Sequence, residues 1–281
     1  MTFSLERPET VAEALRLLSD RSAAPAVPFA GGTDVLLDLD DGRFAPRTVV
    51  SLARLPWRTL KWEGTQLVVG STLPLARLVA DPSARARLPG LVDAAEAVGS
   101  LALRHRATLG GNLGRAAPAS DLIPILLATG AVVRVVSRAG PREVPVAQFV
   151  RGSRETALDP GELIESVAIP AAPRSAYVWQ RVRPANDVSQ VGVAVAWTGA
   201  PPAWQVALGG VLPVPLRIVE AEAVLQGEDP NPAAVELASQ AAATRAPFAT
   251  DRRATESYRR RLVSTLLRRA VRRALAPPGS R

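Results

Sequence analysis

The sequence predicts an α+β protein in which strands and helices are mixed without a regular βαβ repeat. Over residues 1–172, short apolar segments alternate irregularly with helical segments. Beyond residue 172, three strand-like segments follow one another and only helical segments come after them. This order is typical of an antiparallel sheet covered by helices. The change of pattern predicts two domains, residues 1–172 and 173–281.

The amino-terminal domain opens with a helix. Thr10-Val11-Ala12-Glu13 has the pattern of a capping box, which predicts a helix through Leu18. The remaining elements follow from short apolar strand patterns and from helical periodicity. We expect strands over residues 26–29, 48–52, 67–70 and 132–137, and helices over residues 73–80, 91–98 and 121–129, the last ending at Gly130.

The segment Ile169-Pro170-Ala171-Ala172-Pro173 is predicted to link the two domains. After it we expect strands over residues 176–182, 191–198 and 204–211, and helices over residues 216–226, 233–243 and 256–274. In the last helix, apolar residues recur every four positions from Leu262 to Ala274, and arginines occupy the remaining surface. That arginine face is either solvent-exposed or a docking face for an acidic partner subunit.

Two diglycine turns mark the candidate binding site. The first is Ala30-Gly31-Gly32-Thr33-Asp34, and the second is Thr108-Leu109-Gly110-Gly111-Asn112. Without side chains, a Gly-Gly step lets backbone N–H groups approach a ligand closely. Such groups form good anion sites. One diglycine alone is usually a plain turn, but two of them could hold a diphosphate from both sides.

Composition excludes several kinds of chemistry. The chain has no cysteine and a single histidine, His105, so it cannot build a disulfide framework, a zinc site or an iron–sulfur cluster from its own ligands. We also find no catalytic triad, no paired carboxylates at a convincing spacing and no metal-ligand cluster in the sequence. Redox chemistry would therefore need a bound organic cofactor. The amino-terminal segment lacks the apolar stretch of a signal peptide, and no apolar run could span a bilayer, so we expect a cytoplasmic protein.

The net charge of +8 raises the alternative of a basic nucleic-acid-binding module. Aromatic residues make up only 4% of the chain, which leaves few platforms on which bases could stack. The diglycine segments would have no role in such a module. We therefore expect no nucleic-acid partner.

Several motifs, in order along nearly the whole chain, resemble the flavin subunit of the molybdenum hydroxylases, a family that includes carbon monoxide dehydrogenase and xanthine dehydrogenase. The motifs are AGGTDVLL from Ala30, ATLGGNLGRAAPASDLIPILL from Ala107, the segment 180–194, a GGV pattern from Gly209, and the tail over residues 251–269. The resemblance implies a two-lobed FAD-binding domain of the PCMH/vanillyl-alcohol-oxidase type, with lobes of about residues 1–53 and 54–172. It also implies a carboxyl-terminal domain with a three-stranded antiparallel sheet and a helix bundle.

The resemblance further implies FAD as the cofactor, bound without a covalent link. Both diglycine segments would wrap its diphosphate, Asp121 would reach its hydroxyl groups, and the flavin ring would lie between the two domains. Because the carboxylate of Asp34 would repel phosphate, its side chain should point elsewhere; the alternative is a cap on its own turn. The alternative for Asp121 is the N-cap of the helix it precedes. The implied cofactor-binding residues are Ala30, Gly31, Gly32, Thr33, Asp34, Val35, Thr108, Leu109, Gly110, Gly111, Asn112, Asp121, Leu163, Ile164 and Gln180.

Three positions depart from the family pattern. Gln180 stands where relatives often have a lysine beside the flavin ring, and Arg181 or Arg183 could compensate. His105 replaces an asparagine and is the one residue that could attach a flavin covalently; the alternative is a loop hydrogen-bonder. Ala117 replaces a polar residue before a proline. Leu163 and Ile164 would form an apolar wall against the ring, or be plain core.

The resemblance thus predicts the FAD-binding electron-transfer subunit of a molybdenum hydroxylase. Its partners would be a molybdopterin-containing large subunit, where the substrate is hydroxylated, and a [2Fe–2S] small subunit, together forming a dimer of heterotrimers. The alternative is a stand-alone flavin- or nucleotide-binding protein with the same fold.

Overall fold

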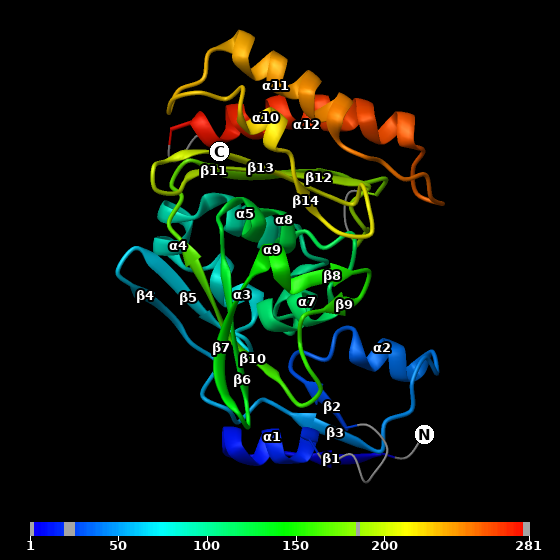
Figure 1. Cartoon of the computed structure of the whole chain (residues 1–281). Helices are drawn as coiled ribbons and strands as arrows, with labels where there is room; N and C mark the ends of the chain where they lie inside the picture. The colour runs from blue at the N-terminus through cyan, green and yellow to red at the C-terminus, as the bar shows by residue number, and fades with distance from the viewer. Residues whose placement is uncertain (1–2, 20–25, 184–185, 278–281) are drawn as a thin grey trace.

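The computed structural model describes residues 3–19, 26–183 and 186–277, and Figure 1 shows their arrangement in layers. Helices α10, α11 and α12 cover one side of a carboxyl-terminal sheet, and helices α5 and α8 of the amino-terminal domain lie on its other side. A second sheet and a third, smaller one continue the amino-terminal domain away from this interface (Figure 1). The expected α+β class with two domains is confirmed.

The smaller sheet is parallel and has the strand order β1-β3-β2. Its helices are α1, which begins at the predicted capping box, and α2. The hydroxyl of Thr10 accepts a hydrogen bond from the amide of Glu13 (3.2 Å), and the carboxylate of Glu13 accepts one from the amide of Glu9 (3.1 Å). We call β1–β3 with α1 and α2 the amino-terminal lobe. Its elements are β1 (Ser4–Glu6), α1 (Val11–Ser19), β2 (Ala26–Phe29), α2 (Val35–Asp40) and β3 (Thr48–Ser51).

The largest sheet is antiparallel, with the order β4-β5-β10-β6-β7. It is formed by β4 (Leu60–Glu63), β5 (Gln66–Gly70), β6 (Val132–Ser137), β7 (Gly140–Pro145) and β10 (Leu163–Pro170). Around it lie α3 (Leu75–Val79), α4 (Pro82–Arg87), α5 (Pro89–Ala97), α6 (Leu101–Arg104), α7 (Leu109–Arg115), α8 (Leu122–Ala128), α9 (Val146–Phe149) and the hairpin β8 (Val150–Gly152) and β9 (Glu155–Thr156).

The carboxyl-terminal sheet has the order β11-β12-β13-β14 and is antiparallel throughout. The three expected strands are its body. The helix expected from residue 216 is wrong at its start, because Leu216 and Arg217 pair with β13 as a short fourth strand. The elements are β11 (Ser175–Gln180), β12 (Val191–Thr198), β13 (Ala203–Gly209), β14 (Leu216–Arg217), α10 (Val219–Glu222), α11 (Pro232–Arg245) and α12 (Glu256–Leu275).

Successive side chains of β12 point to opposite faces of the sheet, so the sheet contributes to the cores of both domains. Val193 and Val195 pack into the core with the carboxyl-terminal helices, while Ala194 and Ala196 face the core of the amino-terminal domain. The small alanines let α5 and α8 lie close to the sheet. An ion pair fixes the edge of this contact, since Arg273 of α12 donates to both oxygens of Asp93 in α5 (2.6 and 3.0 Å).

Two expectations about the backbone are wrong. The second diglycine is not a turn, because Gly110 and Gly111 lie in the first turn of α7. The hydroxyl of Thr108 caps that turn by accepting from the amide of Gly111 (3.0 Å), which lets the glycines continue as helix. The proposed linker is also shorter than expected, because Ile169 and Pro170 belong to β10 and pair with β5.

Candidate functional site

The two glycine pairs meet at one cavity of about 530 Å³ between the amino-terminal lobe and the rest of its domain. Residues 30–35 form one wall, and Thr108, Gly110, Gly111 and Asn112 of the capped α7 segment form another. Segments some eighty positions apart in the sequence are therefore neighbours. A concave site with a few converging polar groups is the usual form of a cofactor site.

The first wall offers backbone donors. Gly32 has φ = +77°, which turns the chain sharply into α2, and the carbonyl of Gly32 accepts from the amide of Leu36 (3.0 Å). Within the described residues, the amides of Gly31, Gly32, Thr33 and Asp34 have no acceptor. These are the free donors that every helix start leaves behind. An anion placed in the cavity can accept hydrogen bonds from them.

The second wall is different, because the amides of its glycines and of Asn112 are engaged within the protein. The amide of Gly110 donates to the carbonyl of Ser71 (3.2 Å), and the amide of Asn112 donates to the carbonyl of Thr108 (3.0 Å). Gly110 is needed for close packing, since a Cβ there would lie 2.5 Å from the Cβ of Ser71. The second glycine pair therefore contributes shape, and the first glycine pair contributes free donors.

The two walls touch directly. A Cβ on Gly31 would lie 2.0 Å from the carbonyl oxygen of Arg106, and the Arg106 guanidinium donates to the carbonyl of Gly31 at 3.4 Å. Only glycine permits the backbones to approach this closely. Gly31 thus sets the spacing between the loops on either side of the cavity.

The acidic side chains of α2 point to an arginine of the opposite wall. Arg115 pairs with Asp34 at 3.3 Å and also forms an ion pair with Asp38, to whose Oδ1 it donates at 3.1 Å. This pairing neutralises Asp34, whose carboxylate would otherwise repel an anion in the cavity. The alternative that Asp34 caps its own turn is wrong, because it makes no side-chain cap bond.

The apolar part of the lining includes the expected Leu163 and Ile164, both buried. Sequence reasoning missed Asp38 and Arg115, although Asp34 and Asp38 are spaced to share one face of a helix. It also missed Val98, Leu103 and Leu158, which widen the apolar lining and carry no motif in the sequence.

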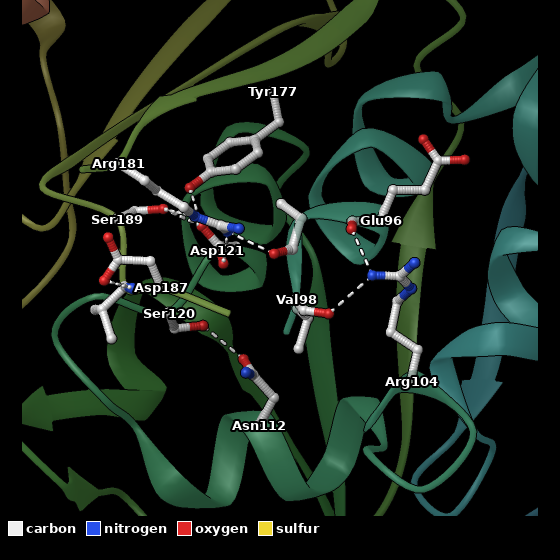
Figure 2. Close-up of polar contacts among 12 residues, drawn as sticks. Glu96, Val98, Arg104, Asn112, Ser120, Asp121, Tyr177, Arg181, Asp187 and Ser189 are labelled. Carbon is white, nitrogen blue, oxygen red and sulfur yellow. Dashed lines mark hydrogen bonds and ion pairs between the residues drawn. The ribbon is translucent and has the colours of Figure 1, made fainter. Parts of the chain in front are cut away.

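Asp121 is buried at the interface of the two domains and does not line the cavity. Its carboxylate accepts from Tyr177 (2.8 Å), Arg181 (2.8 Å) and Ser189 (2.5 Å) of the carboxyl-terminal domain (Figure 2). Burial raises the pKa of Asp121, and Arg181 and the two hydroxyls oppose that rise. Asp121 is the N-cap residue of α8, as the alternative expected, but its side chain makes no cap hydrogen bond.

The same network reaches the cavity wall through the end of α5. Arg181 donates to the carbonyl of Ala97 (2.5 Å), and Arg104 donates to the carbonyls of Glu96 (2.8 Å) and Val98 (3.1 Å). Figure 2 shows both arginines converging on this segment, of which Val98 lines the cavity. On the other side, the hydroxyl of Ser120 donates to Asn112, another lining residue (2.5 Å).

The remaining expected residues lie outside the lining. Leu109 is fully buried core, and the Gln180 amide donates to the carbonyl of Arg181 (2.7 Å). Arg181 is paired with Asp121, so its charge is not free to replace the missing lysine. His105 is exposed at the end of α6, and the carbonyl of Ala117 accepts from the amide of Ser120 (2.9 Å).

The amino-acid sequence matches two known families. Residues 1–172 match the FAD binding domain in molybdopterin dehydrogenase, and residues 176–274 match the CO dehydrogenase flavoprotein C-terminal domain. The chain is 29% identical over 288 residues to the xanthine dehydrogenase FAD-binding subunit of Escherichia coli O157:H7, covering 99% of this chain and 98% of that protein. It is 29% identical over 282 residues to the carbon monoxide dehydrogenase medium chain of Afipia carboxidovorans, covering 98% and 97%.

The fold is similar as well. The structure of quinoline 2-oxidoreductase from Pseudomonas putida 86 aligns with a TM-score of 0.89 and 25% identity, covering 98% of this chain and 97% of that chain. Within the part of the chain that the structure describes, no helix is both long and apolar enough to cross a bilayer.

Proposed function

The chain belongs to the family of FAD-binding subunits of the molybdopterin dehydrogenases, and from that premise we propose that it is the electron-transfer subunit of a molybdenum hydroxylase complex. Family membership confirms FAD as the cofactor. The observation that carries the proposal is the cavity between the glycine pairs, where four consecutive amides have no acceptor among the described residues.

In the proposed complex the amides of Gly31, Gly32, Thr33 and Asp34 bind the FAD diphosphate, and the hydroxyl of Thr33 adds a further donor. Hydrogen bonds to a charged group stabilise it by about 1.5–3 kcal/mol each. Ala30 and Val35 complete this wall. Thr108, Gly110, Gly111 and Asn112 form the facing wall, and Leu163 and Ile164 exclude water from the flavin.

Leu109, Asp121 and Gln180 are left out of these proposed contacts. The side chain of Leu109 is core, and those of Asp121 and Gln180 are engaged within the protein. Asp121 instead holds the carboxyl-terminal domain against α8, and thereby supports the wall that carries Val98.

When bound, FAD supplies the ability to exchange single electrons with iron–sulfur clusters and electron pairs with an external acceptor. The chain itself binds and orients the cofactor. The proposed partners are a [2Fe–2S] small subunit that delivers electrons and a molybdopterin-containing large subunit where the substrate reacts, assembled as a dimer of heterotrimers.

The proposal is tested by purifying the tagged chain from its native cells. We expect a flavin absorption spectrum, FAD and not FMN on chromatography of the released cofactor, and co-purifying molybdenum and iron. A yellow chain that elutes alone, without either metal, would support the stand-alone flavoprotein instead. A colourless chain that takes up no added FAD would overturn the cavity assignment.

A further inference from the structure

We propose that Arg115 and Asp38 form a latch across the cofactor cavity, and that this ion pair sets how tightly FAD is retained. The inference rests on the proposed FAD cavity. Arg115 ends α7, whose first turn carries the second glycine pair, and Asp38 lies in α2, just after the first glycine pair. Both residues line the cavity.

Burial makes this pair different from an ordinary surface ion pair. The side chain of Asp38 is 7% exposed and that of Arg115 is 20% exposed. Surface ion pairs usually contribute little. A buried carboxylate that loses one of its cations, however, loses part of the compensation for its lost hydration. The Arg115 guanidinium holds the pKa of Asp38 below its ordinary value, although burial acts in the opposite direction.

The ion pair between Arg115 and Asp38 connects the two walls of the cavity. The amino-terminal lobe is attached to the larger sheet by an apolar cluster around Leu163, Leu55 and Trp57. At the cavity itself, the amino-terminal lobe meets the rest of its domain through Arg115 and through the close contact at Gly31. Movement of α2 away from α7 would widen the cavity and carry the free amides of residues 31–34 away from the cofactor. Breaking the latch should therefore speed FAD release.

Asp38 has a second cation that serves as a matched control. Arg43 donates to Asp38 at 2.9 Å and pairs with Asp41 at 2.8 Å, but all three lie in the amino-terminal lobe. Arg43→Gln removes one positive charge and one ion pair to Asp38 without disconnecting the two walls. Arg115→Gln makes the same chemical change and does disconnect them.

The experiment measures FAD dissociation from the full chain by flavin fluorescence, together with the urea unfolding midpoint of each apoprotein. We expect Arg115→Gln to weaken FAD binding about tenfold, or about 1.4 kcal/mol, and Arg43→Gln to change it by less than about twofold. Equal FAD affinity in the two variants would overturn the latch. Wild-type chain that binds no FAD would instead remove the proposed cavity function on which the latch rests.

The variant Asp38→Asn distinguishes the latch from a second explanation, in which Arg115 attracts the cofactor directly. The same variant provides the test if Arg115→Gln does not fold. A latch predicts weaker FAD binding, because Arg115 then keeps only its pair with the half-exposed Asp34. If Arg115 acted as a cation for the FAD phosphates, releasing it from Asp38 would leave FAD binding unchanged or tighter. Either of those results would overturn the proposal.

Discussion

Arg181 in the carboxyl-terminal domain donates to the carboxylate of Asp121 in the amino-terminal domain at 2.8 Å, and both side chains are at most 10% exposed. Burial raises the pKa of Asp121 and raises that of its neighbour Tyr177 well above the ordinary value. The phenol therefore stays protonated and donates to the carboxylate. The two domains are joined by a buried charged network as well as by apolar packing.

Removing one member of this network should destabilise the folded protein. We expect Arg181→Met to lower the free energy of unfolding by about 3–5 kcal/mol, because Asp121 is left without its buried cation. Adding Asp121→Asn to that variant should recover part of the loss. Arg183→Gln is the control, since its side chain is 68% exposed and should cost less than about 0.5 kcal/mol. Urea denaturation measures all three, and equal midpoints for Arg181→Met and Arg183→Gln would contradict the prediction.

The two glycine pairs that line the cavity give a second prediction. Gly31→Ala places a Cβ 2.0 Å from a backbone oxygen, so the loops must separate and both the unfolding midpoint and FAD occupancy should fall. At Gly111 the added Cβ would meet, among the described residues, just the Thr108 hydroxyl oxygen, at 3.1 Å. Gly111→Ala should therefore keep the unfolding midpoint and lower FAD occupancy through direct contact with the cofactor. Absorbance at flavin wavelengths gives the occupancy. Full occupancy in Gly111→Ala would mean that this wall does not touch the cofactor.

The sequence predicts an element correctly where the contacts that determine the element lie close together along the chain. The capping box at Thr10 places α1, and the strand-like segment over residues 191–198 places β12, a central strand of the carboxyl-terminal sheet. The turn predicted for the second glycine pair is wrong because its conformation is decided by the Thr108 cap, which statistics for Gly-Gly steps do not include.

The partners of charged side chains could not be predicted in the same way. Arg115 meets Asp38 across 77 positions, and Arg181 meets Asp121 across 60. Nothing in the sequence distinguishes these arginines from the exposed ones on α12. The resemblance places Asp121 at the cofactor, whereas in the structure its carboxylate is buried and accepts from three donors of the other domain.

The ion pair between Arg273 and Asp93 leads to a third prediction. Asp93 is buried at the domain interface, and Arg273 donates to both of its oxygens. Arg273→Gln should lower the free energy of unfolding by about 1–3 kcal/mol, because a buried acceptor loses its charged donor. The neighbouring Arg272 is exposed, so Arg272→Gln should change stability by less than about 0.5 kcal/mol. Thermal unfolding of both variants tests this, and a loss of equal size in each would contradict it.

The lowered pKa of Asp38 predicts a specific dependence of stability on pH. Asp38 titrates near its ordinary value of 3.8 in the unfolded chain and below it in the folded protein. Between these two values the unfolded state binds more protons, so stability rises with pH there. The contribution of Asp38 is complete above the unfolded value and is lost as pH falls through the folded one. The urea midpoints of wild type and Asp38→Asn should therefore differ most at neutral pH and converge in strong acid. A gap that stays constant from neutral pH to strong acid would show that Asp38 stabilises the lobe by packing and not by its charge.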